Sequence, residues 1–164
     1  MAKQETAFQY LATVLVLALV YAAAAVLVLR VFAGNNVVSV VWPSSGIALA
    51  ALLLLGWRYW PSVFLGAVLG NWLGGASSSL MVPIGIGIGS SLEAVLGYWL
   101  LRHVVRINVA MVHPHDFFWL ASVGALTSLL SACIGVTVLY YDNYIQAWEV
   151  PRNVFQWWGR RVGH

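Results

Sequence analysis

The stretch from Tyr10 to Leu29 carries no charged side chain. A transmembrane helix needs about 20 such residues to cross roughly 30 Å of hydrocarbon, so this run points to a membrane-spanning chain. Of all 164 residues, 62% are hydrophobic and only 8% are charged. A soluble domain of this size cannot bury so much apolar surface, so we predict an integral membrane protein. The net charge of +3 is too small to indicate nucleic-acid binding.

Glycine, proline and asparagine divide the chain into segments that favour an all-α membrane domain of about five transmembrane helices. The first apolar run is longer than the roughly 7–15 residues typical of a cleavable signal peptide, so we expect a retained helix. The expected helices run from about Phe8 to Phe32, Val37 to Leu55, Pro61 to Leu73, Met81 to Val105 and Phe117 to Tyr141.

The basic residues predict how this domain is oriented. Cytoplasmic loops of membrane proteins are enriched in lysine and arginine. A cytoplasmic N-terminus leaves Arg30 and Arg152 near the outer face and, with five crossings, places the C-terminus outside. The inner side then carries Lys3, Arg58, Arg102 and Arg106.

The second expected helix is preceded or interrupted by a Trp-Pro-Ser-Ser-Gly break at residues 42–46. Proline lacks an N–H, and hydroxyls and glycine also disfavour a continuous helix. In one interpretation the helix restarts at membrane depth with Ser44 or Ser45 as its cap, and together with Trp42 it lines a small polar or anionic niche. In the other, which residue types alone favour, residues 37–42 form an outer-face segment and Pro43 occupies the first helical turn.

Glu93 lies near the middle of the fourth expected helix, where an ionisable group is costly. Gly85, Gly89 and Gly97 share its helical face, because these residues follow one another at spacings of four with Glu93. One interpretation is a protonated glutamate that forms a hydrogen bond across a packed helix pair. The other is a ligand contact or a proton-sensitive switch. The residues themselves favour neither.

A second ridge of small residues, Gly66, Gly70 and Gly74, occurs on the third expected helix. Two such ridges predict that the third and fourth helices pack closely against each other. Asn71 is most simply a hydrogen-bonding residue between helices, and it could reach Glu93 if the two helices are antiparallel neighbours.

The remaining polar residues do not indicate catalysis. His113, His115 and Asp116 form a weak metal motif, and we expect Asp116 to cap the fifth helix instead. Cys133, the only cysteine, lies in an apolar run and excludes an internal disulfide. We therefore expect no enzyme, no metal and no cofactor.

Three sequence blocks resemble the first type of the bacterial membrane-associated sensor family, the MASE input domains. They are W-P-S-S-G-I-A-L-A from Trp42, R-Y-W-P from Arg58 and L-E-A-V-L-G-Y-W-L-L-R from Leu92. No block is specific alone, but the three together are. The similarity extends from about residue 37 to about residue 158.

The resemblance implies a multi-pass sensory module in the bacterial cytoplasmic (inner) membrane. Family members precede histidine kinases, diguanylate cyclases and phosphodiesterases. The resemblance also implies that a set of positions matters, for sensing or for packing. These positions are Trp42, Pro43, Ser44, Ser45, Gly46, Asn71, Glu93 and Arg102.

The sequence departs from the family pattern after the Trp157-Trp158 pair. Family members continue with an L-G-D-A-x-G block and further helices, whereas residues 159–164 form a divergent tail here. We therefore expect residues 1–158 to form the sensor-like domain, in a member that is truncated at its C-terminus and lacks a catalytic output domain.

The sequence thus predicts a signal-input module embedded in the lipid bilayer, with an output protein in trans or self-association as its route to a response. An alternative is a solute-binding membrane subunit of a transporter, which would use the same polar niche. A third interpretation is a sensor fragment that folds without signalling.

Overall fold

The structure, a computed structural model, describes residues 6–32, 43–75, 79–107, 114–143 and 145–155. The described residues form helices and turns and contain no strand. The α-helices are α1 (Ala7–Phe32), α2 (Pro43–Leu55), α3 (Trp60–Leu73), α4 (Met81–Trp99) and α5 (Pro114–Tyr141). Three shorter elements are the 3₁₀ turns η2 (Trp57–Tyr59) and η4 (Ala147–Glu149) and the π-helical segment η3 (Leu100–Val105) that continues α4.

The all-α architecture is confirmed, one helix start differs from expectation, and another falls partly outside the described residues. Residues 37–42 of the expected second helix lie outside the described residues, and α2 begins at Pro43. The expected cap at Asp116 is wrong, because α5 already begins at Pro114 and Asp116 lies within its first turn. A carboxylate in this position still interacts favourably with the helix dipole.

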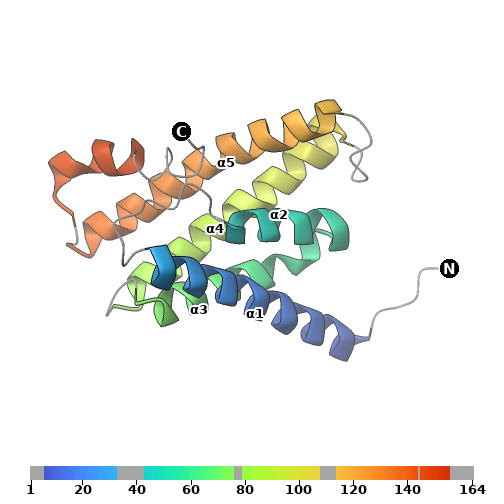
Figure 1. Ribbon diagram of the computed structural model, residues 1–164, viewed down its shortest axis with the longest axis horizontal. Coiled ribbons are helices and arrows are strands. Elements are labelled where there is room, and N and C mark those ends of the chain that lie inside the picture. Colours follow the sequence, from blue (N-terminus) through green and yellow to red (C-terminus); the bar gives the residue numbers. More distant parts are fainter. Residues whose placement is uncertain (1–5, 33–42, 76–78, 108–113, 144, 156–164) are drawn as a thin grey trace.

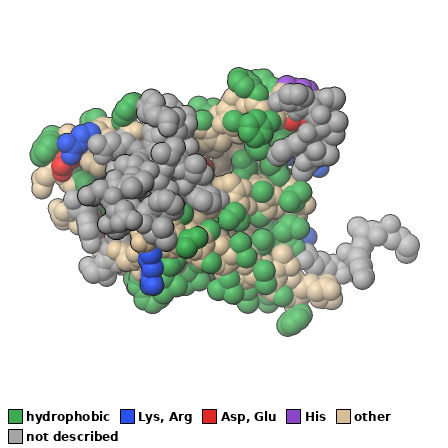
Figure 2. All heavy atoms as spheres, in the orientation of Figure 1, with side chains coloured by type: hydrophobic (Ala, Val, Ile, Leu, Met, Phe, Trp, Pro, Cys, Tyr) green, Lys and Arg blue, Asp and Glu red, His purple; other side chains and the backbone are tan. Residues whose placement is uncertain are grey.

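Three helical segments are long and apolar enough to cross a membrane: Ala7–Arg30, Met81–Val105 and His115–Tyr141. The helices α2 and α3 contain 13 and 14 residues, respectively. Each is therefore about 20 Å long at 1.5 Å per residue, shorter than the hydrocarbon core. Hydrophobic side chains are spread over the part of the visible face that is not grey, and the charged side chains lie toward its two ends (Figure 2). This surface suits lipid rather than water.

The helices form a bundle in which α4 is central (Figure 1). Helices α1 and α3 pack against each other, α3 also packs on α4, and α5 packs on the other side of α4. The shorter α2 lies against α1 and α4. A core of buried side chains joins α1, α2, α3 and α4, and it includes Tyr21, Ala25, Leu52, Ala67 and Ala94.

The glycines of α3 face α1. A Cβ atom built on Gly66 would lie 2.7 Å from the Cβ of Tyr21, and one on Gly70 would lie 2.7 Å from the Cβ of Ala25. A Cβ on Gly74 would collide with the side chain of Leu29. These glycines therefore allow the backbones of α1 and α3 to approach closely.

Three glycines of α4, Gly85, Gly89 and Gly97, face two other helices. A Cβ on Gly85 would collide with Val138 of α5, and one on Gly89 would lie 3.3 Å from Ile134. Gly97 faces Leu49 of α2, at 3.1 Å. The third and fourth helices do pack against each other, but their predicted ridges do not meet, because each ridge faces a different neighbour.

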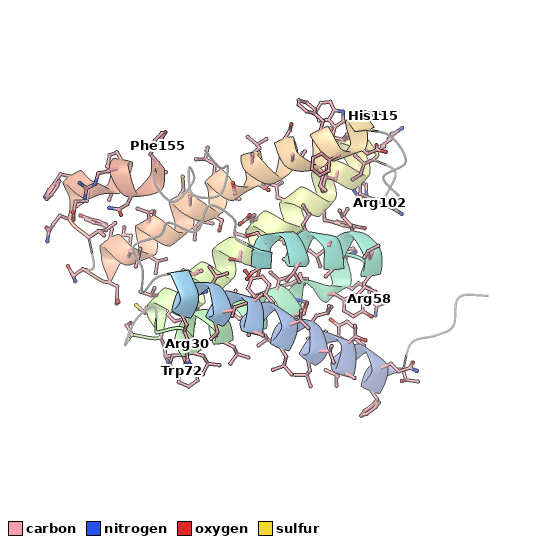
Figure 3. The ribbon with its side chains drawn as sticks, viewed as in Figure 1. Arg30, Arg58, Trp72, Arg102, His115 and Phe155 are labelled. Carbon is pink, nitrogen blue, oxygen red and sulfur yellow. The ribbon has the colours of Figure 1, made fainter. Side chains whose placement is uncertain are left out.

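The arginines labelled in Figure 3 lie at the two ends of the bundle. Arg58, Arg102 and His115 lie at one end, and Arg30 and Trp72 lie at the other (Figure 3). The Arg30 guanidinium donates a hydrogen bond to the carbonyl oxygen of Leu73 at its end, over 3.3 Å. Helices that alternate in direction give this separation in either orientation, so the cytoplasmic N-terminus stays a prediction of the positive-inside rule.

We expect alkaline phosphatase fused after His164 to be active in cells, because five crossings from a cytoplasmic N-terminus export the C-terminus. The same enzyme fused after Ile107, behind four crossings, should be inactive. Green fluorescent protein at the two positions should give the reverse pattern. An exported Ile107 fusion, or a fluorescent His164 fusion, would contradict this topology.

The glycine contacts predict opposite effects for one substitution at two positions. Gly70→Ala should lower the free energy of unfolding by roughly 1–3 kcal/mol, because the added methyl overpacks the contact between α1 and α3. Gly124→Ala should be neutral or stabilising, because a Cβ there meets nothing within 4 Å and alanine favours the helix by up to about 1 kcal/mol. Unfolding with increasing mole fraction of sodium dodecyl sulfate measures both; equal stabilities would show that Gly70 is not a close contact.

Candidate functional site

The N-terminus of α2 lies inside the bundle, level with the middle of α4. Gly97 is in contact with Leu49, and Ser45 shares a cavity with Glu93. Because α2 and α4 run in the same direction, this register places Pro43 about halfway along the helical segment that α4 and η3 form together. Figure 1 shows α2 beginning near the middle of the molecule. Residues 43–46 of the predicted break therefore form the first turn of a helix that starts within the bundle.

A cavity of about 440 Å³ lies beside this helix start, between α1, α2, α4 and α5. Volumes of roughly 300–1,000 Å³ are usual for small-molecule sites. The helix α1 contributes Tyr21 to its wall. Its apolar lining comes mainly from α2 and α5, with Ala48, Leu49, Leu53 and Leu120.

Two polar side chains of α4 line the cavity. Ser90 and Glu93 are three residues apart and so share a helical face. Ser90 is 4% exposed and Glu93 is 7% exposed. The Ser90 Oγ has no hydrogen-bond partner among the described residues. A buried hydroxyl without a partner is costly, and a bound molecule in the cavity would relieve that cost.

Two hydroxyl groups of α5 complete the polar lining. Thr127 donates a hydrogen bond to the carbonyl oxygen of Val123, over 3.0 Å, and Ser128 donates one to Ala125, over 2.8 Å. Each hydroxyl uses its single hydrogen in its own helix and keeps lone pairs free to accept. The lining of α5 therefore offers acceptors to an occupant.

Small residues form the side of the cavity between α2 and α5. Gly46 and Gly124 both line it, and a Cβ on either would meet nothing within 4 Å. Ala50 and Ala121 also line the cavity and are exposed. The cavity is therefore open on this side of the bundle.

The structure brings together some of the predicted site residues. Ser45, Gly46 and Glu93 line the cavity. Ser44 is buried behind them, and its Oγ has no partner among the described residues. Pro43 forms the first residue of α2, and Trp42 lies outside the described residues.

Two predicted residues lie elsewhere. Asn71 is buried, and its side-chain nitrogen donates a hydrogen bond to the carbonyl oxygen of Ala67 in the same helix, over 2.8 Å. Arg102 is exposed in η3 at the charged end of the bundle (Figure 3). Neither lines the cavity.

The sequence interpretation missed the hydroxyls of Ser90, Thr127 and Ser128 and the ring of Tyr21. A signal for Ser90 exists, since it precedes Glu93 by one helical turn. Isolated hydroxyls in an apolar helix usually bond to their own backbone, so Thr127 and Ser128 could not be distinguished from structural residues by sequence.

The acidic residue at the start of α5 belongs to a different region. The Oδ1 of Asp116 lies 3.4 Å from the Nε2 of His115, and its Oδ2 has no partner among the described residues. No group of three potential metal ligands occurs in the described part of the chain. His113 lies outside it.

Ser90 and its neighbour Ser91 provide a matched test of the unpaired hydroxyl. Ser90→Ala should leave the free energy of unfolding unchanged or raise it, because it removes a buried group without a partner. Ser91→Ala should lower it by about 0.5–1.5 kcal/mol, because the Ser91 hydroxyl donates to the carbonyl oxygen of Gly87 over 2.8 Å. Detergent unfolding of both variants checks this; a larger loss for Ser90→Ala would show that its hydroxyl is paired in the empty protein.

Comparison with protein-family models matches residues 12–162 to MASE1. No curated protein and no solved structure matches the chain.

Proposed function

Because the chain belongs to the MASE1 family of membrane-associated sensor input domains, we propose that it is a bacterial inner-membrane sensory module whose stimulus occupies the cavity beside α2. The observation that carries this proposal is the buried pair Ser90 and Glu93 on the wall of an open cavity of about 440 Å³. Burial of a carboxyl group and an unpaired hydroxyl reduces stability, so a binding role accounts for their position better than packing does.

The start of α2 supports a binding role in the same place. Irregular backbone at membrane depth is tolerated where protein or a polar cavity covers it. The first turn of a helix has N–H groups without helical partners and a partial positive charge. In α2 this turn lies against the cavity that contains Glu93. Transporters use interrupted helices in a similar way to hold polar ligands.

A route from the cavity to the charged end of the bundle runs along α4. Ser90 and Glu93 lie on α4, which continues into the π-helical segment Leu100–Val105. That segment ends at Arg106, whose φ of 57° is left-handed. Short π-helical segments are frequent at functional sites. An occupant that binds one conformation of α4 more tightly would raise the population of that conformation. The segment Leu100–Val105 at the charged end of the bundle would then move with α4.

The output belongs to another polypeptide in this proposal. The module has no catalytic role of its own, and it acts on a signalling protein in trans or on a second copy of itself. Neither a metal nor a cofactor takes part. A response in kinase phosphorylation or cyclic-dinucleotide level, without solute uptake, is the expected signature.

The same cavity also fits a solute-binding subunit of a transporter, and its open side between α2 and α5 favours this second candidate specifically. The two functions differ in what the cell loses when the protein is deleted. Loss of uptake with unchanged signalling would overturn the sensory proposal.

We expect Glu93→Gln to change the signalling output of cells while the protein still folds. The measurement is kinase phosphorylation and cyclic-dinucleotide level in a deletion strain complemented with each variant. A tenfold change in an underlying equilibrium requires only about 1.4 kcal/mol, which is about the effect of one hydrogen bond to a buried side chain. Glu149→Gln is the control, because Glu149 pairs with Arg152 outside the cavity, over 3.5 Å. Output that is identical for wild type and Glu93→Gln would reduce Glu93 to a packing residue.

A further inference from the structure

We propose that the cavity beside α2 binds an apolar molecule with one protonated primary amine, which the Glu93 carboxylate and the Ser90 hydroxyl hold together. This inference rests on the proposed function for the location of the site and adds the chemical class of its ligand.

Charge is the first reason. None of the described residues that line the cavity is Lys, Arg or His, and Glu93 is the acidic one. The first turn of α2 contributes only about half a positive charge, which is less than the full charge of the carboxylate. A bound anion would therefore be repelled, so the anionic niche expected at the break in the sequence is disfavoured. A cation would be attracted strongly at this low dielectric.

Hydrogen bonding is the second reason. An ammonium group has three donors and no acceptor. The Ser90 Oγ is unpartnered among the described residues. The oxygens of Thr127 and Ser128 keep free lone pairs, because each hydroxyl hydrogen already points to a backbone carbonyl. The cavity thus presents acceptors where a primary amine presents donors, and charge-assisted hydrogen bonds are the stronger kind.

The rest of the lining selects an apolar body. Ala48, Leu49, Leu53 and Leu120 face the cavity. Burial of a hydrocarbon chain against them contributes about 0.8 kcal/mol for each CH₂. The lining of the cavity therefore fits a ligand that has one polar head group and a hydrocarbon chain.

The open side indicates how such a molecule enters. The small residues Gly46, Ala50, Ala121 and Gly124 border the opening between α2 and α5. At this depth of a membrane-spanning bundle the surroundings are hydrocarbon. A primary amine can cross hydrocarbon in its neutral form, so entry from this side moves no net charge through the bilayer.

The test uses three six-carbon probes with different head groups: hexylamine, hexanol and hexanoate. Each is titrated calorimetrically into the full chain in zwitterionic phosphatidylcholine nanodiscs, with empty nanodiscs as the reference. We expect hexylamine to bind about tenfold more tightly than hexanol, since tenfold corresponds to about 1.4 kcal/mol. Hexanoate should give no signal above the empty discs.

Three variants assign the binding to the cavity. Glu93→Gln should lower hexylamine affinity to that of hexanol, and Ser90→Ala should weaken hexylamine alone. Gly124→Leu should weaken hexylamine and hexanol together, because its side chain would enter the cavity through space that is open. Glu149→Gln should bind like the wild type. Thermal unfolding establishes that each variant is folded. If Glu93→Gln does not fold, Ser90→Ala and Gly124→Leu alone test whether hexylamine binds in the cavity.

Two outcomes would overturn the inference. One is binding of all three probes in proportion to their partition into empty discs. The other is an unchanged preference for hexylamine over hexanol in folded Glu93→Gln. If Glu93→Gln does not fold, the inference is overturned by an unchanged preference in Ser90→Ala together with an unchanged affinity for both probes in Gly124→Leu. Failure here is separable from failure of the sensory proposal, which depends on signalling in cells. If the protein signals but binds no amine, only the proposed ligand class is wrong. If it binds amines but changes no signalling output, the sensory proposal is wrong.

Discussion

The start of α2 within the bundle places polar backbone where a membrane protein must satisfy it internally. A helix that begins within a bundle has N–H groups with no helical partner, and hydrocarbon offers none. The protein surrounds the start of α2 with α1 and α4 and places Glu93 nearby. The N–H groups at the start of α2 must be satisfied inside the protein. The short α2 and the cavity with its hydroxyl lining lie where this need arises.

Close packing of α1, α3 and α4 supports the region around the start of α2. Gly66 and Gly70 let α3 press against α1, and Gly87 lies against Val68 and Phe64 between α3 and α4. These contacts tie α1, α3 and α4 into one unit with few voids. The helices α2 and α5 then pack on α4 from different sides, and the cavity lies between them.

The sequence predicted the helices well because long apolar runs and turn residues are local signals. It predicted that Gly66 and Gly85 lie on close-packed faces and that the third and fourth helices pack together, and α3 does pack on α4. A spacing of four residues does not say which helix covers a face, and Gly66 faces α1 whereas Gly85 faces α5. Ser45, Gly46 and Glu93 were found as candidates, since an acid and a helix break are rare at membrane depth. Their meeting depends on the register of α2 against α4, which no local pattern determines.

The opening between α2 and α5 has a consequence for how such modules diversify. A Cβ added to Gly46 or Gly124 at the opening would meet nothing within 4 Å. A Cβ added to Gly66 or Gly70 would collide with α1. Added methyl groups at the opening would narrow it without disturbing the bundle. Ligand size can therefore drift between related proteins by single substitutions that cost no stability, while the helix contacts that hold the fold stay fixed.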